Sequence, residues 1–224
     1  MSSSNKSDLH LNWATYSAVS YACKKWHYSK SVPAGKLIKV GVWEKGVFIG
    51  CVIYSRGANY RMLNKYGLTQ EQGCELTRIA LSSHKTPVSR ILSISLSFLK
   101  KSSPSLKLVV SYADPMQDHH GGVYQASNWI YAGVSGTGPQ YWYRGRWAHN
   151  KTVHEAHLSK AEKSRLKRRV PPGKHTYLMP LNSQMRDKVL SLAQPYPLRS
   201  KQVQVSSPDK NGGAAPTRTL QNLT

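Results

Sequence analysis

The sequence predicts an α/β domain in which a mixed sheet is flanked by helices, and three observations lead to this fold class. Residues 37–54 form two β-rich runs joined by Glu44-Lys45-Gly46, a pattern typical of a hairpin. Residues 74–112 alternate as strand, helix and strand, which is a βαβ unit whose strands pair in parallel. Strand and helix patterns continue to alternate after this unit, as expected of a layered α/β sheet.

Local patterns support each element in turn. Apolar residues at helical spacing predict a helix over residues 13–25. Pro87 suits the start of a helix at 88–101, and Lys100 and Lys101 suit its C-terminal end. The remaining predicted elements are, in chain order, strands at 37–43 and 47–54, a short helix at 59–66, strands at 74–81 and 106–112, a helix at 121–128, strands at 129–134 and 141–147, a basic helix at 159–169, a strand at 175–181 and a helix at 183–192.

The βαβ unit also predicts where a ligand would bind. In sheets of this class, ligands bind beyond the C-terminal ends of the strands. The two strands of the unit end in the loops 82–90 and 113–124, so we expect both loops at one rim of the sheet. Catalytic and binding residues concentrate on loops of this kind.

The composition adds a strong positive charge. Of 224 residues, 32 are Lys or Arg and 10 are Asp or Glu, which gives a formal net charge of +22. Such a charge predicts a polyanionic partner, and nucleic acid is the commonest one. An anionic membrane is a weaker alternative, because the sequence has no long basic amphipathic helix and no apolar run long enough for a span. A basic protein without such a partner is the third alternative.

Charge and composition also divide the chain. Residues 141–224 hold 16 of the 32 basic residues but only 4 of the 10 acidic ones. From about residue 195 the sequence is polar and rich in Pro, Gly and Ser, so we expect one domain at 1–194 and a disordered basic tail at 195–224. The candidate DNA-phosphate contacts lie in the densest basic stretch and are Arg144, Arg146, Lys163, Arg165, Lys167, Arg168 and Arg169.

Three cysteines and the N-terminal residues bear on the compartment. Cys23, Cys51 and Cys74 are too few and too scattered for a disulfide framework or a cysteine zinc site. Residues 1–13 lack the apolar region of a secretory signal. We therefore expect a reducing, intracellular setting.

The loop at 113–124 is the first candidate for chemistry. Asp114 stands at the end of a predicted strand and is followed by Pro, paired His and paired Gly residues up to Tyr124. Asp114 is a candidate ligand or base, and Tyr124 a candidate acid or orienting phenol. The structural alternative is that Asp114 caps a turn and Tyr124 packs in the core.

The loop at 82–90 is the second candidate. Backbone N–H groups at the start of the following helix can hold an anion, and Ser89 and Arg90 add side-chain donors, so a phosphate of a cofactor or of DNA would fit there. A plain helix start is the alternative.

His27 and Tyr28 follow the first predicted helix directly and would be structural if considered alone. His154 and His157 lack the spacing of a metalloprotease motif, and the chain has no P-loop, GxGxxG or GxSxG motif.

Four blocks of the sequence resemble a known family. They are WHYSKSVPAGK at 26–36, ELTRIAL at 75–81, SRILSISLSFLKK at 89–101 and SYADPMQDHHGGVYQASNWIYAG at 111–133. Through them the chain resembles the Mom family, the adenine-modifying DNA proteins of phage Mu type, which are similar in turn to the N-acetyltransferase fold. The resemblance covers roughly residues 10–180, and the last block is its most specific part.

The resemblance implies an activity and a site. It implies an acetyltransferase-like fold and the replacement of a hydrogen on adenine N6 in double-stranded DNA by a carbamoylmethyl (acetamido) group. This modification would shield phage DNA from restriction enzymes in the cytoplasm of the host cell. The family's functional residues fall on His27, Tyr28, Asp114 and Tyr124. The family is linked to iron, for which His27 and Asp114 would be ligands, with a tyrosinate as a third.

The resemblance departs from its parent fold in one respect. Acetyltransferases bind the coenzyme A pyrophosphate with a glycine-containing loop, whereas the corresponding loop here, SSHKTPVSR, has no glycine. Whether acetyl-CoA or a related molecule is the donor therefore stays open, and Ser89 and Arg90 are the candidate contacts of such a cofactor. Two other functions also stay open: an acyl-CoA-dependent N-acetyltransferase acting on an amine, and a DNA-binding protein without catalysis.

Overall fold

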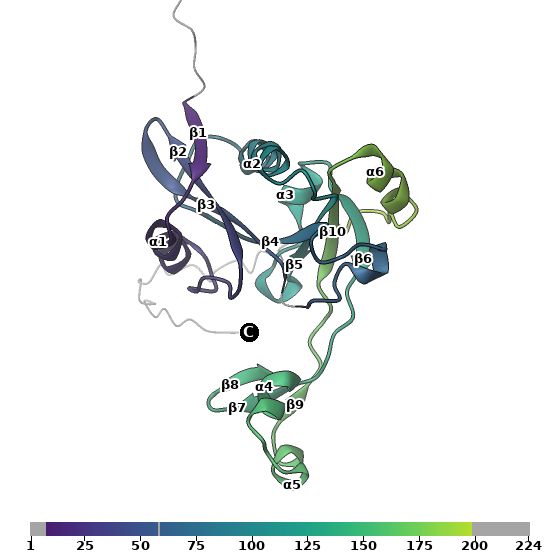
Figure 1. Ribbon diagram of the computed structural model, residues 1–224. Coiled ribbons are helices and arrows are strands. Elements are labelled where there is room, and N and C mark those ends of the chain that lie inside the picture. Colours follow the sequence, from purple (N-terminus) through teal and green to yellow (C-terminus); the bar gives the residue numbers. More distant parts are fainter. Residues whose placement is uncertain (1–7, 58, 199–224) are drawn as a thin grey trace, which may run out of the picture.

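A seven-stranded mixed sheet forms the body of the protein, as the computed structural model in Figure 1 shows. The structure describes residues 8–57 and 59–198. The strand order is β1-β2-β3-β4-β5-β10-β6, and β4 and β5 are the parallel pair. The prediction of a mixed sheet flanked by helices is therefore confirmed. The strands are β1 (Leu9–Trp13), β2 (Leu37–Glu44), β3 (Val47–Ser55), β4 (Gly73–Leu81), β5 (Leu108–Ala113), β6 (Ile130–Val134) and β10 (His175–Pro180).

Helices cover both faces of this sheet. Alternate residues of β3 face opposite ways: Cys51 and Ile53 pack against α1 (Tyr16–Trp26), whereas Val52 and Tyr54 pack in the cluster that contains α2 (Val88–Ser102). The short helix α3 (Gly122–Gln125) lies on the α2 side. The helix α6 (Ser183–Leu190) covers β5, β10 and β6 on the α1 side. Two 3₁₀ turns complete the body, at Asn64–Tyr66 and Pro115–Gln117.

The pairing of β4 with β5 is short. Four residue pairs join the two strands, from Gly73 opposite Leu108 to Leu76 opposite Ser111. Beyond Leu76, β4 continues to Leu81 beside β3, whereas β5 pairs along its whole length with β10. The two strands therefore diverge at their C-terminal ends, which opens the rim where a ligand was expected.

A second, three-stranded sheet stands away from the body (Figure 1). We call residues 140–169 the appendage. Ser135 and Lys174 join the two connecting segments through Ser135 N–H to the Lys174 carbonyl, 2.8 Å, and Lys174 N–H to Ser135 Oγ, 3.0 Å. The appendage consists of β7 (Gln140–Tyr143), β8 (Arg146–His149), α4 (Asn150–Glu155), α5 (Lys160–Ser164) and β9 (Arg168–Arg169).

The appendage corrects two sequence predictions. The strand predicted at 141–147 is a hairpin, whose tip residues Arg144 and Gly145 both have positive φ, at 51° and 73°. The helix predicted at 159–169 ends after one turn, because the chain beyond it pairs with β7, where Trp142 N–H donates to the Lys167 carbonyl.

The N-terminal prediction also changes. Trp13, predicted to begin the first helix, lies in β1 beside β2, and the helix starts after Thr15, whose hydroxyl accepts a bond from Ala18 N–H.

Most of the predicted tail, residues 199–224, lies outside the residues that the structure describes. Within 195–198, the Tyr196 hydroxyl donates to the Trp129 carbonyl at 2.7 Å, so this short stretch is tied to the body. Among the described residues, no helix is both long enough and apolar enough to cross a membrane.

The core around α2 yields a stability prediction. Leu99 is fully buried against the sheet, so we expect Leu99→Ala to lower the free energy of unfolding by about 2–5 kcal/mol. Lys100→Ala, at the next and exposed position, should change it by less than about 0.5 kcal/mol. Urea unfolding of both variants measures the difference, and equal effects would contradict the assigned core.

Candidate functional site

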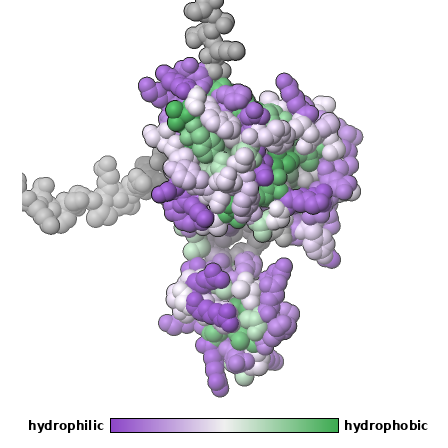
Figure 2. Space-filling view, turned by 60° about the vertical axis from the view of Figure 1, so that its left-hand side comes forward, coloured by the Kyte–Doolittle hydropathy of each residue, from purple (hydrophilic) through white to green (hydrophobic). Residues whose placement is uncertain are grey.

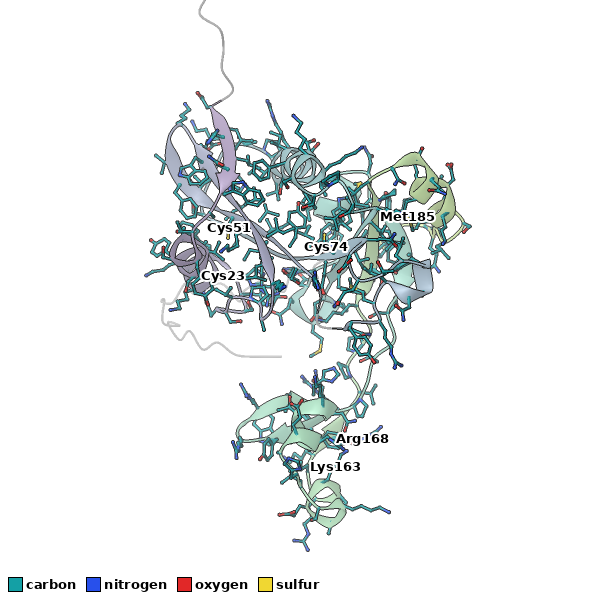
Figure 3. The ribbon with its side chains drawn as sticks, in the orientation of Figure 1. Cys23, Cys51, Cys74, Lys163, Arg168 and Met185 are labelled. Carbon is teal, nitrogen blue, oxygen red and sulfur yellow. The ribbon has the colours of Figure 1, made fainter. Side chains whose placement is uncertain are left out.

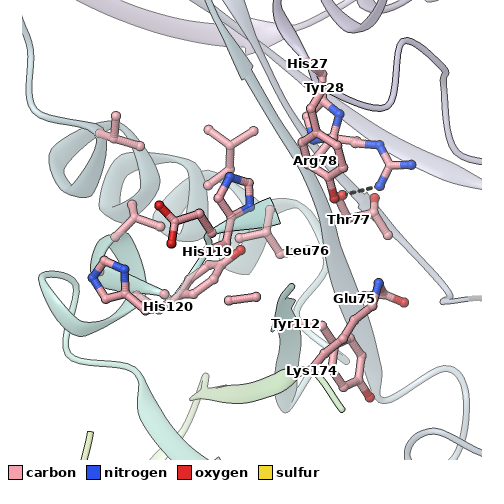
Figure 4. Close-up of a pocket in the computed structure, with 18 residues that line it drawn as sticks. His27, Tyr28, Glu75, Leu76, Thr77, Arg78, Tyr112, His119, His120 and Lys174 are labelled. Carbon is pink, nitrogen blue, oxygen red and sulfur yellow. Dashed lines mark hydrogen bonds between the residues drawn. The ribbon is translucent and has the colours of Figure 1, made fainter. Parts of the chain in front are cut away.

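A cavity of about 410 Å³ lies where β4 and β5 diverge (Figure 4). We call it the main cavity. Six parts of the chain meet around it: the end of α1, the strand β4, the start of α2, the end of β5, the loop at 118–124 and the residue before β10. Its charged, imidazole and phenol side chains are those of His27, Tyr28, Glu75, Arg78, Tyr112, Asp118, His119, His120, Tyr124 and Lys174.

His27 ends α1 and is held in one tautomer. Its backbone N–H donates to the Cys23 carbonyl, and its side chain is buried with 8% of the residue exposed. Ser29 N–H donates to His27 Nδ1 at 3.1 Å, and the Ser29 hydroxyl lies 2.8 Å from the same nitrogen. Because a backbone N–H can only donate, Nδ1 is an acceptor and the neutral ring carries its proton on Nε2.

Burial sets the charge of this histidine. Desolvation, followed by the positive charge of Arg78, lowers the pKa of His27 from 6.5 to about 4. The ring is therefore neutral near pH 7. With Nδ1 engaged and Nε2 protonated, it offers a hydrogen-bond donor, whereas a general base would need a free lone pair.

Aromatic rings form one wall of the main cavity. Tyr28 follows His27, and their ring centroids lie 4.3 Å apart at an interplanar angle of 33°. The Tyr28 and His119 ring centroids lie 5.4 Å apart in a T-shaped arrangement. Half of Tyr28 is exposed, so its ring offers a flat surface to an incoming planar group.

Tyr124 lies in α3, and two other aromatic rings hold its side chain in place. Its ring packs on Trp129 at 5.1 Å and on Tyr177 at 5.0 Å. Gly121, at φ 86°, begins this turn, and any Cβ there would overlap the Tyr177 ring. The Tyr124 hydroxyl lies 2.8 Å from Ser111 Oγ, and burial raises the pKa of Tyr124 to about 12. The phenol is thus protonated at neutral pH.

Asp114 points elsewhere. It does not line the main cavity. One carboxylate oxygen accepts from Met116 N–H at 3.0 Å, as the turn-capping alternative expected, and the other lies 3.0 Å from Lys174 Nζ. Asp114 lines a neighbouring cavity of about 570 Å³ between the body and the appendage, which we call the crevice. The main cavity and the crevice share three lining residues: Glu75, Tyr112 and Lys174.

These positions do not fit an iron centre held by His27 and Asp114. The two side chains line different cavities, His27 Nδ1 is engaged by Ser29, and Asp114 is paired with Lys174. Over residues 8–57 and 59–198, no group of three or more His, Cys, Asp or Glu side chains is arranged to hold a metal ion.

The predicted phosphate contacts Ser89 and Arg90 lie in the first turn of α2, and neither lines the main cavity or the crevice. Two amides of the preceding loop are occupied. The Glu44 carboxylate, at the end of β2, accepts from Lys85 N–H at 2.9 Å and from Thr86 N–H at 2.8 Å. These bonds, with that of the Thr86 hydroxyl foremost, lower the pKa of Glu44 to about 2. A side-chain anion is thus bound in the loop just before the start of α2, where a phosphate was expected.

Several residues of the main cavity were not singled out from the sequence. Arg78 and Glu75 project from β4, and the Arg78 guanidinium donates to the Thr77 carbonyl at 2.7 Å (Figure 4). Arg78 Nε is buried and has no hydrogen-bond partner within the described part of the chain. Charged residues inside the otherwise apolar run CELTRIAL were the available signal.

All seven predicted DNA contacts lie in the appendage, where Figure 3 labels Lys163 and Arg168. Five are exposed: Arg144, Arg146, Arg165, Lys167 and Arg168. The other two are partly buried and brace the small sheet. Lys163 lies over the Tyr141 ring at 5.1 Å, and Arg169 lies over the Trp147 ring at 4.3 Å. Figure 2 shows that hydrophilic side chains dominate this part of the visible surface.

The buried His27 predicts a pH dependence of stability. Its folded pKa near 4 lies below its unfolded value, so the unfolded state binds more protons between about pH 4 and 6.5. The free energy of unfolding should therefore fall as pH decreases through this window, by up to about 1.4 kcal/mol per pH unit for this group. His27→Gln should flatten the slope, measured by denaturant unfolding at several pH values. An unchanged slope would contradict the assignment.

Comparisons with known proteins place the chain. No curated protein matches it. A crystal structure of aminoglycoside acetyltransferase AAC(6')-Ib, in complex with coenzyme A and kanamycin, is similar with a TM-score of 0.47 and 9% identity, covering 81% of this chain and 99% of that one. The Mom protein family matches over residues 8–198, which is most of the sequence. The chain therefore belongs to the Mom protein family, a membership that supports a role in the modification of phage DNA.

Proposed function

We propose that this protein is a DNA modification enzyme that adds a carbamoylmethyl group to N6 of adenine in double-stranded phage DNA, and so shields it from host restriction. The observation that carries the proposal is one cavity, walled by Tyr28 and Tyr124 and containing Arg78 and Lys174, in a Mom-family chain with a basic appendage. Its volume of about 410 Å³ lies within the usual range of ligand sites, about 300–1,000 Å³.

The reaction makes defined demands. A donor must carry the two-carbon amide on a leaving group. The N6–C bond forms while the bond from the donor carbon to the leaving group breaks and takes its electron pair. One N6 proton passes to a base or to water. Adenine N6 is a poor nucleophile because its lone pair is delocalised into the ring, so positioning and proton removal both contribute.

The cavity supports extrusion of the target base from the duplex. Bond formation at N6 needs access to the nitrogen, which a flipped base provides. Tyr28 would stack on the base through the part of its ring that His27 does not cover. Tyr124, protonated and fixed beside Ser111, would orient the base or the donor. Asp118 and Glu75 are the carboxylates that line this cavity and the candidates to receive the proton.

The exposed basic side chains of the appendage support the binding of DNA. These arginines and lysines would contact phosphates with little reading of base sequence. The Arg144–Arg146 tip is narrow, because a two-residue turn joins β7 to β8. A phosphate grip at the appendage would leave the main cavity free to receive the extruded base.

Mass spectrometry of nucleosides tests the reaction. DNA from cells that express the chain should contain deoxyadenosine enlarged by one C2H3NO unit. Tyr28→Ala should lower the modified fraction about tenfold or more, because stacking contributes about 1–3 kcal/mol per base, whereas Tyr28→Phe should retain most of it. Tyr16→Ala, an exposed tyrosine at the start of α1, is the matched control. Unmodified DNA would overturn the proposal, and acetylation of an amine by acetyl-CoA would favour the acyltransferase alternative.

Charge reversal tests the DNA contact. Replacing Arg165, Lys167 and Arg168 by Glu should weaken duplex binding and reduce its salt slope by about 0.9 for each lost phosphate contact. The matched control reverses Lys100 and Lys101, which lie at the end of α2 on the body. Binding titrations at several salt concentrations measure both. An appendage variant that binds like the control would place the DNA contact elsewhere.

A further inference from the structure

Lys174 lies at the junction between the main cavity and the crevice and lines both. It is the residue immediately before β10, where the second connecting segment returns from the appendage. Its backbone is fixed on both sides of the residue by hydrogen bonds with Ser135. The place of this cation is therefore set by the fold.

Asp114 fixes the other end of the Lys174 side chain. The carboxylate lies 3.0 Å from Lys174 Nζ, and its side chain is 20% exposed, against 50% for the lysine. Asp114 is itself held by Met116 N–H, so its orientation does not depend on the lysine. An ammonium has three N–H donors, and the bond to Asp114 uses one, which leaves two for a ligand.

The geometry relates this ammonium to a nucleotide. A base that stacks on Tyr28 inside the main cavity must keep its sugar and phosphate at the cavity's edge, joined to the duplex. Lys174 is a half-exposed cation at the edge that the cavity shares with the crevice. Arg61 and Lys65, both exposed, also line the crevice. Phosphate oxygens are the groups that a lysine at such a position binds.

We infer that Lys174 binds a phosphate of the extruded nucleotide, and that Asp114 is a positioning residue that holds the Lys174 ammonium in place. The inference rests on the proposed function, because it takes DNA as the substrate. It also gives Asp114 a role that its position outside the main cavity permits. Loss of the Asp114 charge would release the lysine side chain while leaving His27, Tyr28 and Tyr124 where they are.

Binding of a single nucleotide tests this inference directly. Deoxyadenosine monophosphate and deoxyadenosine differ only in the phosphate, so the ratio of their dissociation constants isolates the contact. The wild-type chain should bind the monophosphate at least about tenfold more tightly, as expected for a charged hydrogen bond. Lys174→Met should abolish this preference, whereas Lys174→Arg should retain much of it. Lys100→Met is the control cation on the body and should behave like wild type.

A double-mutant cycle tests the positioning role. Asp114→Asn keeps an oxygen that can accept from Met116 N–H but removes the charge that faces Lys174. It should lower the phosphate preference less than Lys174→Met does, and the double variant should lose no more than Lys174→Met alone. Thermal unfolding of each variant verifies that it is folded.

Three results would overturn the inference: no phosphate preference in the wild type, an unchanged preference in Lys174→Met, or losses in the two single variants that multiply in the double variant. Nucleoside analysis of DNA from cells expressing the wild type reports separately on the proposed function. Wild-type modification together with a Lys174→Met variant that binds like wild type would remove this inference alone.

Discussion

The short parallel pairing of β4 with β5 is the constraint on which the site depends. Both strands begin side by side, but only four residue pairs join them before β4 follows β3 and β5 follows β10. Beyond the last pair, Leu76 opposite Ser111, the strands separate, and Arg78 lies in this unpaired part of β4. The cavity opens there, and the end of α1 and the loop at 118–124 also line it. The main cavity is thus a consequence of where backbone pairing stops.

The protonation states of the surrounding groups define what this cavity offers. His27 is neutral and can donate a hydrogen bond, and Tyr124 keeps its proton. Asp114 forms an ion pair with Lys174 outside the cavity. Tyr28 contributes a flat ring, while Arg78 and Lys174 contribute positive charge. Such a set suits the binding and orientation of a planar base that carries a phosphate. Glu44 occupies two amides of the loop before α2, a loop that has no glycine.

Local patterns in the sequence predicted most of the body, whereas long-range partners set the rest. The hairpin of β2 and β3, the βαβ unit and α2 follow from turn residues and periodicity, and all are present. The turn at Arg144–Gly145 was missed because the residues on either side are uniformly β-rich. His27, Tyr28 and Tyr124 line one cavity although they are distant in the sequence. Asp114 does not line it, since its carboxylate caps the turn at Met116 and pairs with Lys174, two contacts that the sequence pattern alone does not show.

Photo-cross-linking measures most directly whether the main cavity receives an extruded adenine. A duplex that carries 8-azidoadenine in place of adenine is bound, irradiated and digested, and the cross-linked peptides are identified by mass spectrometry. The account predicts cross-links from the base to Tyr28 or to residues 118–124, which line the main cavity. Cross-links confined to the appendage, with none at the cavity, would show that the base stays in the duplex and would contradict the account.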